Sequence, residues 1–352
     1  MITSKVMKSK VKVAVGISGG VDSSVSAALL QKQGYEVIGV HLVCYSEDVP
    51  FCTSAEDREM AIRVATHLNI PLKILDLRKE YKERVIDYMI GEYQINRTPN
   101  PDVMCNSKIK FDLFYDYARD ELGADFVSTG HYARVDQEGN LYKALDESKD
   151  QSYFLATVDK EVLKKVRFPI GDLIKTDVRK LAYQFGLPTD NRPDSQGICF
   201  VGEAPLKEFL QKYIDLVPGD VVNLQGEKVG THYGLTLYTI GQRHGFNLSI
   251  SDKAPSYVLS KNSEKNELVV GGRGELKVKS FKVAAIDDIS EVKNLTVRIR
   301  HLGECVPCEI EKTASEGVYI VRLKRPMESV APGQIAVFYK NDLVVGSGFI
   351  EN

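Results

Sequence analysis

The 352-residue sequence has no apolar run of membrane-spanning length and no marked excess of charge of either sign. A spanning helix needs about 20 consecutive apolar residues, and the first residues, MITSKVMK, lack the apolar core of a signal peptide. We therefore expect a cytoplasmic protein that does not engage a membrane. With 46 basic and 48 acidic residues the net charge is −2. Because no overall positive field indicates a nucleic-acid partner, any RNA site must rest on local basic patches.

Cysteine is also scarce, with six residues in the chain. In a reducing compartment these thiols do not form structural disulfides, so they are buried, bind metal or take part in chemistry. Cys305 and Cys308 form a CxxC pair, which is half of a zinc site without a second half. We expect no protein-bound metal, and we assign no function to this pair or to Cys44 and Cys52.

At this length two or three domains are expected, and a composition of 43% hydrophobic and 27% charged residues is that of a globular protein. Up to about residue 200 strand-like and helix-like patterns alternate. The strands are expected at 11–16, 36–43, 72–76 and 125–129, and the helices at 23–33, 55–68, 79–92 and 108–122. This alternation predicts an α/β domain with a parallel sheet covered by helices on both faces. Ligands of such sheets bind beyond the carboxyl ends of the strands.

After about residue 205 short alternating runs broken by glycine replace the helical periodicity. Many short strands at regular spacing indicate a small barrel or sandwich. We predict three domains: an α/β catalytic domain at 1–204, a β-rich central linker domain at 205–275 and a second β-rich domain at 276–352.

A glycine turn follows the first expected strand, in the stretch VAVGISGGVDSSV at 13–25. Strand, turn and helix start together direct free backbone N–H groups and the positive end of a helix dipole at one point, which favours a phosphate. The lysine of a Walker loop and the GxGxxG spacing of dinucleotide sites are both missing. The stretch resembles instead the SGGxDS loop of the ATP pyrophosphatases, which split ATP into AMP and pyrophosphate to adenylate a substrate.

Two further stretches carry thiols in polar surroundings. In RTPNPDVMCNSKIKF at 97–111 the prolines predict an extended path and a helix that resumes near Ser107, which places Cys105 at or just before a helix N-terminus. Nearby lysines lower a thiol pKa there, and Asp102 is a candidate general acid or base. In DSQGICF at 194–200 Cys199 follows a glycine in a turn. Two reachable thiols suggest sulfur chemistry, with one holding a persulfide and the other attacking it. A metal site formed by both is the rival interpretation.

The motifs SGGVDSSV, TPNPDVMCNSKIKF, TGHYAR, SKDQSYFL, DSQGICFVG and YTIGQRHG occur in the order found in the tRNA-specific 2-thiouridylases. The resemblance covers nearly the whole chain. It implies a PP-loop ATP-pyrophosphatase domain, a central β-rich domain and a C-terminal β-barrel that contacts tRNA. It also implies ATP-dependent 2-thiolation of the wobble uridine, position 34, of tRNA.

The resemblance also implies roles for individual residues. Those expected to hold ATP are Gly16, Ile17, Ser18, Gly19, Gly20, Val21, Asp22, Ser23, Leu42 and Gly130. Magnesium is expected to accompany ATP, with Asp22 as its candidate ligand, and the sequence predicts no permanent cofactor. Those expected to meet the target base or the tRNA are Asn100, Pro101, Asp102, Lys149, Asp150, Gln151, Arg300 and His301.

The same resemblance assigns the sulfur chemistry to two cysteines. Cys199 would receive sulfur as a persulfide from a donor protein, either a sulfur relay protein or a cysteine desulfurase. Cys105 would release that sulfur as a nucleophile, leaving a transient disulfide between Cys105 and Cys199, while Asp102 assists proton transfer. The partners implied are therefore tRNA and a sulfur donor, and we expect a monomer.

The sequence departs from the family pattern at two places outside this chemistry. Ser256 and Tyr257 follow Pro255 where the family usually has a tryptophan, and His301 stands at an often aromatic position. Two rival functions stay open at this point. One is a PP-loop amidating synthetase for a small molecule, and the other is a tRNA-binding scaffold without activity.

Overall fold

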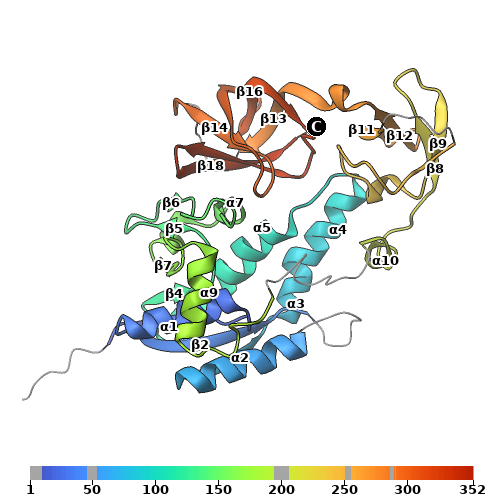
Figure 1. The fold of residues 1–352 in the computed structure, drawn as a ribbon. Helices are drawn as coiled ribbons and strands as arrows, with labels where there is room; N and C mark the ends of the chain where they lie inside the picture. The colour runs from blue at the N-terminus through green and yellow to red at the C-terminus, as the bar shows by residue number, and fades with distance from the viewer. Residues whose placement is uncertain are drawn as a thin grey trace, which may run out of the picture. The chain divides into compact units, whose positions relative to one another are not determined.

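The computed structural model describes residues 10–45, 54–193, 206–249, 255–285, 289 and 291–351. The chain forms two compact units (Figure 1). Unit 1 comprises Met1–Tyr81 and Asn106–Gly202, and unit 2 comprises Lys82–Cys105 and Glu203–Asn352. Each unit is built from two separate stretches of sequence, and residues 82–105 belong with the C-terminal half of the chain.

The sheet of unit 1 is parallel and has five strands in the order β3-β2-β1-β4-β7. The strands are β1 (Lys12–Gly16), β2 (Glu36–Val43), β3 (Leu72–Asp76), β4 (Phe126–Ser128) and β7 (Val166–Arg167). Four of them lie where apolar alternation predicts them. The two-residue β7 is too short to give a periodic signal. The predicted parallel α/β fold is confirmed.

Helices cover both faces of this sheet. Val13 and Val15 pack with Ala27 and Leu30 of α1 (Val21–Lys32) and with α2 (Ser54–Leu68). Successive strand residues point to opposite faces, and a Cβ on Gly16 would lie 3.5 Å from Phe114 of α6 (Phe114–Asp120). The carboxyl end of β1 is thereby fixed between two helical layers.

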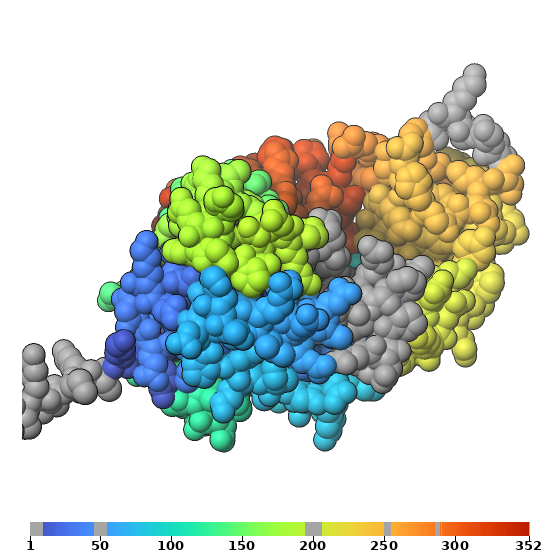
Figure 2. Space-filling model, turned by 60° about the horizontal axis from the view of Figure 1, so that its bottom comes forward, coloured from blue at the N-terminus to red at the C-terminus, as the bar shows by residue number. Residues whose placement is uncertain are grey.

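A second part of unit 1 packs beside α1. The short elements here are β5 (Arg134–Val135), β6 (Leu141–Tyr142), α7 (Ser152–Leu155) and α8 (Lys160–Leu163). They are followed by α9 (Lys175–Gln184), whose Val178 and Ala182 share a buried cluster with Val21 and Val25 of α1. On the face drawn in Figure 2, residues 160–190 in yellow-green border α2 in lighter blue, and His67 of α2 donates from Nε2 to the carbonyl of Phe185 over 2.8 Å.

Two of the four predicted helices are interrupted by π-helical turns. The one expected at 79–92 consists of α3 (Arg78–Tyr81), a π-helical turn at Lys82–Ile86 and α4 (Asp87–Gln94). The one expected at 108–122 consists of a π-helical segment at Asn106–Leu113, with a kink at Phe111, followed by α6.

The expected start of a helix near Ser107 is wrong, because α5 (Pro101–Cys105) already begins at Pro101. Proline is tolerated at the first helical position, where its missing N–H has no partner to lose. The Asn100 side chain accepts a hydrogen bond from the Val103 N–H at 3.3 Å, as a capping residue does. Cys105 therefore lies at the last residue of α5, where the chain continues directly into the π-helical segment at Asn106–Leu113, and not at a helix N-terminus.

Unit 2 contains two β structures. The central one is a five-stranded sheet in the order β10-β9-β8-β12-β11, formed by Asn247–Leu248, Lys228–His232, Gly219–Val222, Glu267–Gly271 and Tyr257–Asn262. The second is a barrel of β13 (Lys277–Ala285), β14 (Leu295–Arg298), β15 (Val306–Lys312), β16 (Val318–Glu328), β17 (Ile335–Lys340) and β18 (Leu343–Ile350).

The barrel is antiparallel and closes through the pairing of β13 with β18, where Val283 lies opposite Ile350. Closure leaves no strand edge unpaired. Cys308, Val321 and Phe338 lie in its apolar core. The predicted C-terminal barrel is confirmed. Across the described part of the chain no helix is both long and apolar enough to cross a bilayer.

Candidate active site

The loop between β1 and α1 is held by its own hydroxyl groups. The Ser18 N–H donates to Ser23 Oγ at 3.3 Å, and the two hydroxyls lie 3.2 Å apart. Ser23 and Ser24 both donate to the Gly20 carbonyl, at 3.1 and 2.7 Å. Gly20 occupies the N-cap position of α1 and makes no side-chain cap, so the first N–H groups of α1 keep the orientation that suits an anion.

Two glycines permit close backbone approach around this loop. Gly19 has a φ of +86°, and a Cβ there would lie 2.6 Å from the Asp57 carbonyl oxygen. A Cβ on Gly130, which follows β4, would lie 2.5 Å from the Ser23 nitrogen. Any side chain at position 130 would therefore push the segment after β4 away from the start of α1.

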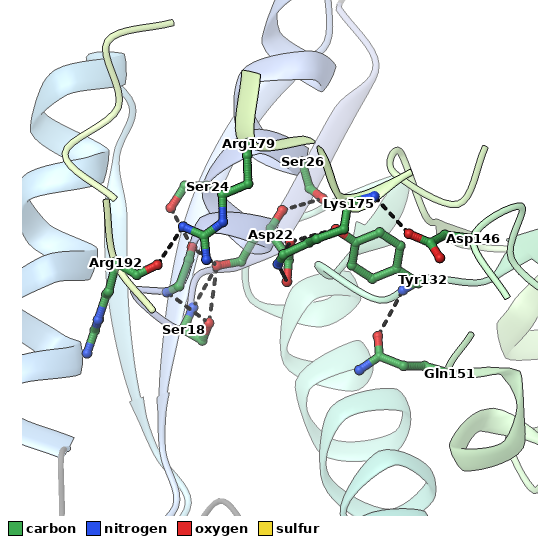
Figure 3. Close-up of polar contacts among 12 residues, drawn as sticks. Ser18, Asp22, Ser24, Ser26, Tyr132, Asp146, Gln151, Lys175, Arg179 and Arg192 are labelled. Atoms are coloured by element: carbon green, nitrogen blue, oxygen red, sulfur yellow. Dashed lines mark hydrogen bonds and ion pairs between the residues drawn. The ribbon is translucent and has the colours of Figure 1, made fainter. Parts of the chain in front are cut away.

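Asp22 in the first turn of α1 is neutralised by a lysine from α9 (Figure 3). Lys175 Nζ lies 2.7 and 2.8 Å from the two carboxylate oxygens, and Tyr132 Oη donates to Oδ1 at 2.9 Å. The Lys175 side chain is 13% exposed and that of Asp22 is 30% exposed. The Lys175 N–H donates to Asp146 at 2.9 Å, which fixes the first residue of α9. This ion pair lies beside the helix end that presents its N–H groups.

Two arginines hold residues 190–192 against the same loop. Arg192 donates to the Gly19 carbonyl at 2.7 Å and to the Asp57 carboxylate at 2.5 Å. Arg179 of α9 donates to the carbonyls of Asp190 and Arg192, at 3.0 and 2.5 Å. The segment that leads to the DSQGICF motif is thus attached to the loop up to residue 192. The motif itself, with Cys199, lies outside the described residues.

The other predicted nucleotide residues lie at the same edge of the sheet. Leu42 is half-buried near the carboxyl end of β2, and its neighbour His41 bonds to the Ile17 carbonyl at 2.8 Å. After β4, His131 is buried and its Nδ1 lies 2.7 Å from the Thr129 hydroxyl. Burial, and secondarily the charge of Lys110, holds the pKa of His131 well below its usual value. Its imidazole is therefore neutral at physiological pH.

Lys149, Asp150 and Gln151 occupy a bend before α7. The Asp150 side chain is fully buried and accepts from the N–H groups of Ala144 and Ser152, each at 3.1 Å. Gln151 accepts from the Tyr132 N–H at 2.9 Å. These two side chains shape the turn that presents Lys149. Their expected contact with tRNA stays a prediction.

In unit 2 the predicted base residues follow α4 and begin α5. Asn100 is 8% exposed and Cys105 is 6% exposed. Asp102, in the first turn of α5, is half-buried. Cys105 is therefore less accessible than its polar neighbours in the sequence suggest. The expected disulfide with Cys199 stays a prediction, because Cys199 is not described.

Two more predicted positions, and the two cysteines without an assigned function, belong to the barrel. Arg300 is exposed and His301 is half-buried, in the turn after β14. Burial, and secondarily Glu309, raises the pKa of Cys308 to about 12, while Cys305 is half-buried. Within the described ranges no group of three His, Cys, Asp or Glu is placed to hold a metal ion.

Comparison with known proteins gives matches along the chain. Residues 11–203 match the family model described as tRNA methyl transferase HUP domain. Residues 207–272 match the tRNA methyl transferase PRC-barrel domain, and 273–350 match the aminomethyltransferase beta-barrel domain.

The tRNA-specific 2-thiouridylase MnmA of Blochmanniella floridana is 42% identical over 96% of this chain and 96% of its own length. The tRNA-specific 2-thiouridylase MnmA 1 of Geobacillus kaustophilus is 43% identical over 98% and 96%. The chain belongs to the tRNA-specific 2-thiouridylase family.

Among solved structures, the NMN synthetase from Francisella tularensis is 19% identical with a TM-score of 0.36, covering 56% of this chain and 71% of that one. A match at this level carries no argument about function.

In this member of the 2-thiouridylase family, several residues that contact the predicted site were not predicted from the sequence. Lys175 and Arg192 lie 153 and 173 residues from their partners Asp22 and Gly19, and neither belongs to a motif quoted above. Tyr132 lies inside TGHYAR, so its position after a strand could have drawn attention to it. Gln334, which contacts Thr98, likewise belongs to none of these motifs.

Proposed function

We propose that this chain transfers sulfur to C2 of the wobble uridine, position 34, of tRNA in an ATP-dependent reaction. The observation that carries this proposal is an ordered phosphate-type loop at 16–23 in a chain that matches 2-thiouridylases over 96–98% of its length. The small-molecule amidating synthetase is not favoured, because the chain matches tRNA-specific 2-thiouridylases over 96–98% of its length.

The first step makes the C2 oxygen a leaving group. That oxygen attacks the α-phosphorus of ATP, the bond to pyrophosphate breaks, and the uracil N3 proton leaves to a base, which we assign to Asp102. The N–H groups at the start of α1 and the charge of Lys175 stabilise the phosphates as pyrophosphate departs. Leu42 and Gly130 border the nucleotide.

Asp22 also suits the magnesium that accompanies ATP. Its carboxylate is a hard oxygen donor of the kind magnesium prefers. A carboxylate has about four acceptor positions, and Asp22 uses three of them for Lys175 and Tyr132. When bound, magnesium withdraws charge from the phosphates during bond breaking.

The second step places sulfur on C2. A donor protein, either a sulfur relay protein or a cysteine desulfurase, loads Cys199 with a persulfide. The Cys105 thiolate attacks Cys199 Sγ, which forms the Cys105–Cys199 disulfide and releases hydrosulfide. Hydrosulfide attacks C2, AMP leaves, and the sulfur-bound proton returns to N3. In this step the sulfane sulfur is reduced to hydrosulfide and the Cys105 thiol is oxidised to the disulfide. A dithiol reductant must then reduce the Cys105–Cys199 disulfide to restore both thiols.

We further propose that tRNA contacts Lys149 and the turn at Arg300 and His301, while Asn100 and Pro101 meet the target base. Asp150 and Gln151 support the bend that carries Lys149. We retain the division at 1–204, 205–275 and 276–352, a monomer and a cytoplasmic location as parts of this proposal.

The test incubates the protein with ATP, magnesium, a persulfide-loaded donor and tRNA transcripts, and measures 2-thiouridine by mass spectrometry. Cys105→Ser and Cys199→Ser should each abolish thiolation, while Cys199→Ser should still release pyrophosphate when tRNA is present. Cys305→Ser, at a half-buried thiol of the barrel, is the matched control and should keep wild-type activity. Pyrophosphate release that needs a metabolite instead of tRNA would support the amidating synthetase.

A further inference from the structure

The loop that joins α4 to α5 is held by residues far away in the sequence. At its start, Lys261 of β11 donates to the Asn96 carbonyl at 2.8 Å, and burial lowers the pKa of this lysine to about 8. Thr98 and Thr239 share a hydrogen bond at 3.2 Å between their hydroxyls. Both contacts lie within unit 2, where one comes from β11 of the central sheet and the other from the connection between β9 and β10.

Next to the barrel, one amide side chain makes hydrogen bonds to the second half of the loop. Gln334, just before β17, donates from Nε2 to the carbonyls of Thr98 and Pro99, at 3.0 and 2.9 Å. Its Oε1 accepts from Asn100 Nδ2 at 3.4 Å. Both N–H bonds of this amide and its carbonyl are used on three successive residues of the loop.

The loop needs these donors because of its prolines. Pro99 and Pro101 carry no backbone N–H, so the segment is poor in donors for its own carbonyls. The backbones also approach closely here: the Thr98 N–H donates to the Pro332 carbonyl at 2.8 Å, and a Cβ on Gly333 would lie 2.8 Å from the Thr98 carbonyl oxygen. A carbonyl removed from water without a hydrogen-bond donor destabilises the folded state. Gln334 supplies a donor to the carbonyls of Thr98 and Pro99.

Gln334 also fixes which way the Asn100 amide points. Asn100 Oδ1 accepts from the Val103 N–H at the start of α5, and Asn100 Nδ2 donates to Gln334. With its two ends thus assigned, the Asn100 amide cannot flip without losing both bonds. The first turn of α5, which carries Asp102, therefore starts from a position that the barrel determines.

We propose that Gln334 is a positioning residue that holds Asn100 and the first turn of α5 in the geometry required by the target base. The proposal rests on the proposed function, because it is that function which gives Asn100 and Asp102 their roles. Gln334 should therefore affect the rate of the chemical step and leave the affinity for tRNA unchanged.

The experiment compares Gln334→Glu and Gln334→Met with Gln225→Glu, at an exposed residue of the β8–β9 turn. The glutamate variant keeps the acceptor for Asn100 but places a carboxylate against two carbonyl oxygens. The methionine variant keeps the length and removes all three bonds. Single-turnover thiolation by the persulfide-loaded protein, the tRNA Kd and amide hydrogen exchange at residues 100–105 are measured for each.

We expect Gln334→Glu to slow single-turnover thiolation by about 100-fold, since small misplacements of reacting groups have effects of that size. Gln334→Met should be slowed less, because it adds no repulsion. The tRNA Kd should stay within about twofold of wild type, and the Val103 amide should exchange faster in both variants. Gln225→Glu should match wild type in every measurement.

A wild-type rate in both Gln334 variants would overturn the proposal. So would a rise in tRNA Kd that accounts for the whole loss, since Gln334 would then act as a tRNA contact. If the glutamate variant fails to fold, the methionine variant decides between these outcomes. If the wild-type protein does not thiolate tRNA, the proposed function fails, and unchanged exchange of the Val103 amide would separately refute the positioning role.

Discussion

Replacing Lys175 by methionine tests whether the ion pair with Asp22 serves the nucleotide loop. At 2.7 Å and an effective dielectric constant of about 20, the attraction between the two charges is about 6 kcal/mol before desolvation. Because both groups are largely removed from water, desolvation offsets much of this and leaves a net effect of about 2–3 kcal/mol. Without Lys175, the Asp22 carboxylate becomes an uncompensated negative charge where we place the phosphates of ATP.

We expect Lys175→Met to lower tRNA-dependent pyrophosphate release by about 100-fold, the typical effect of losing one preorganised electrostatic contact. A double-mutant cycle with Asp22→Asn should give a coupling of about 2–3 kcal/mol in urea unfolding, equal to the net effect of the ion pair. Lys180→Met is the matched control on the same helix, because Lys180 pairs with Asp177 at 69% side-chain exposure and such pairs contribute about 0–1 kcal/mol.

The assay is the release of labelled pyrophosphate at saturating tRNA and varied ATP. A Lys175→Met protein within about threefold of wild type at all ATP concentrations would refute the electrostatic reasoning. A coupling near zero in the cycle would show that the two charges act independently.

Three further predictions follow from close contacts and burial. Gly130→Ala should destabilise unit 1 by about 1–3 kcal/mol in urea unfolding and weaken ATP binding, since its Cβ would meet Ser23 N at 2.5 Å. The control is Gly91→Ala in α4, where a Cβ would meet nothing within 4 Å outside its own helix backbone and chain neighbours. His131 has a lowered pKa in the folded state, so its contribution to stability should fall as pH drops below about 6.5, by up to about 1.4 kcal/mol per pH unit. This is measured as the difference in unfolding free energy between wild type and His131→Gln, and an NMR titration of His131 near its ordinary pKa would contradict it. Cys308, with a pKa near 12, should resist iodoacetamide at neutral pH in the folded protein and react once unfolded, as mass spectrometry would show; equal labelling in both states would exclude burial of this thiol.

The part of the site closest to the first strand was predictable from the sequence because its determinants are local. Gly19, Ser18 and Ser23 are neighbours in the chain, so a strand, a turn and a helix start could be identified together. The parallel sheet followed from strands long enough to show apolar alternation, and its two-residue member β7 was missed for lack of length.

What the sequence did not predict depends on partners that are distant along the chain. In the sequence Pro101 favours an extended path, but it begins α5, with Asn100 capping the helix. Lys175 begins a helix rich in polar residues, so nothing in the sequence distinguishes it from a solvent-exposed lysine. The burial of Cys105 depends on packing around α5, which the lysines next to it in sequence do not indicate.

The contact between Gln334 and the loop before α5 also constrains how the chain is synthesised. The two partners are 236 residues apart, and at roughly 5–20 residues per second a ribosome needs about 10–50 s to make that stretch. Throughout that interval Thr98 and Pro99 have been translated while the amide that will satisfy their carbonyls does not yet exist. In the nascent chain, residues 82–105 therefore lie between the two stretches of unit 1 before the residues that hold them have been translated.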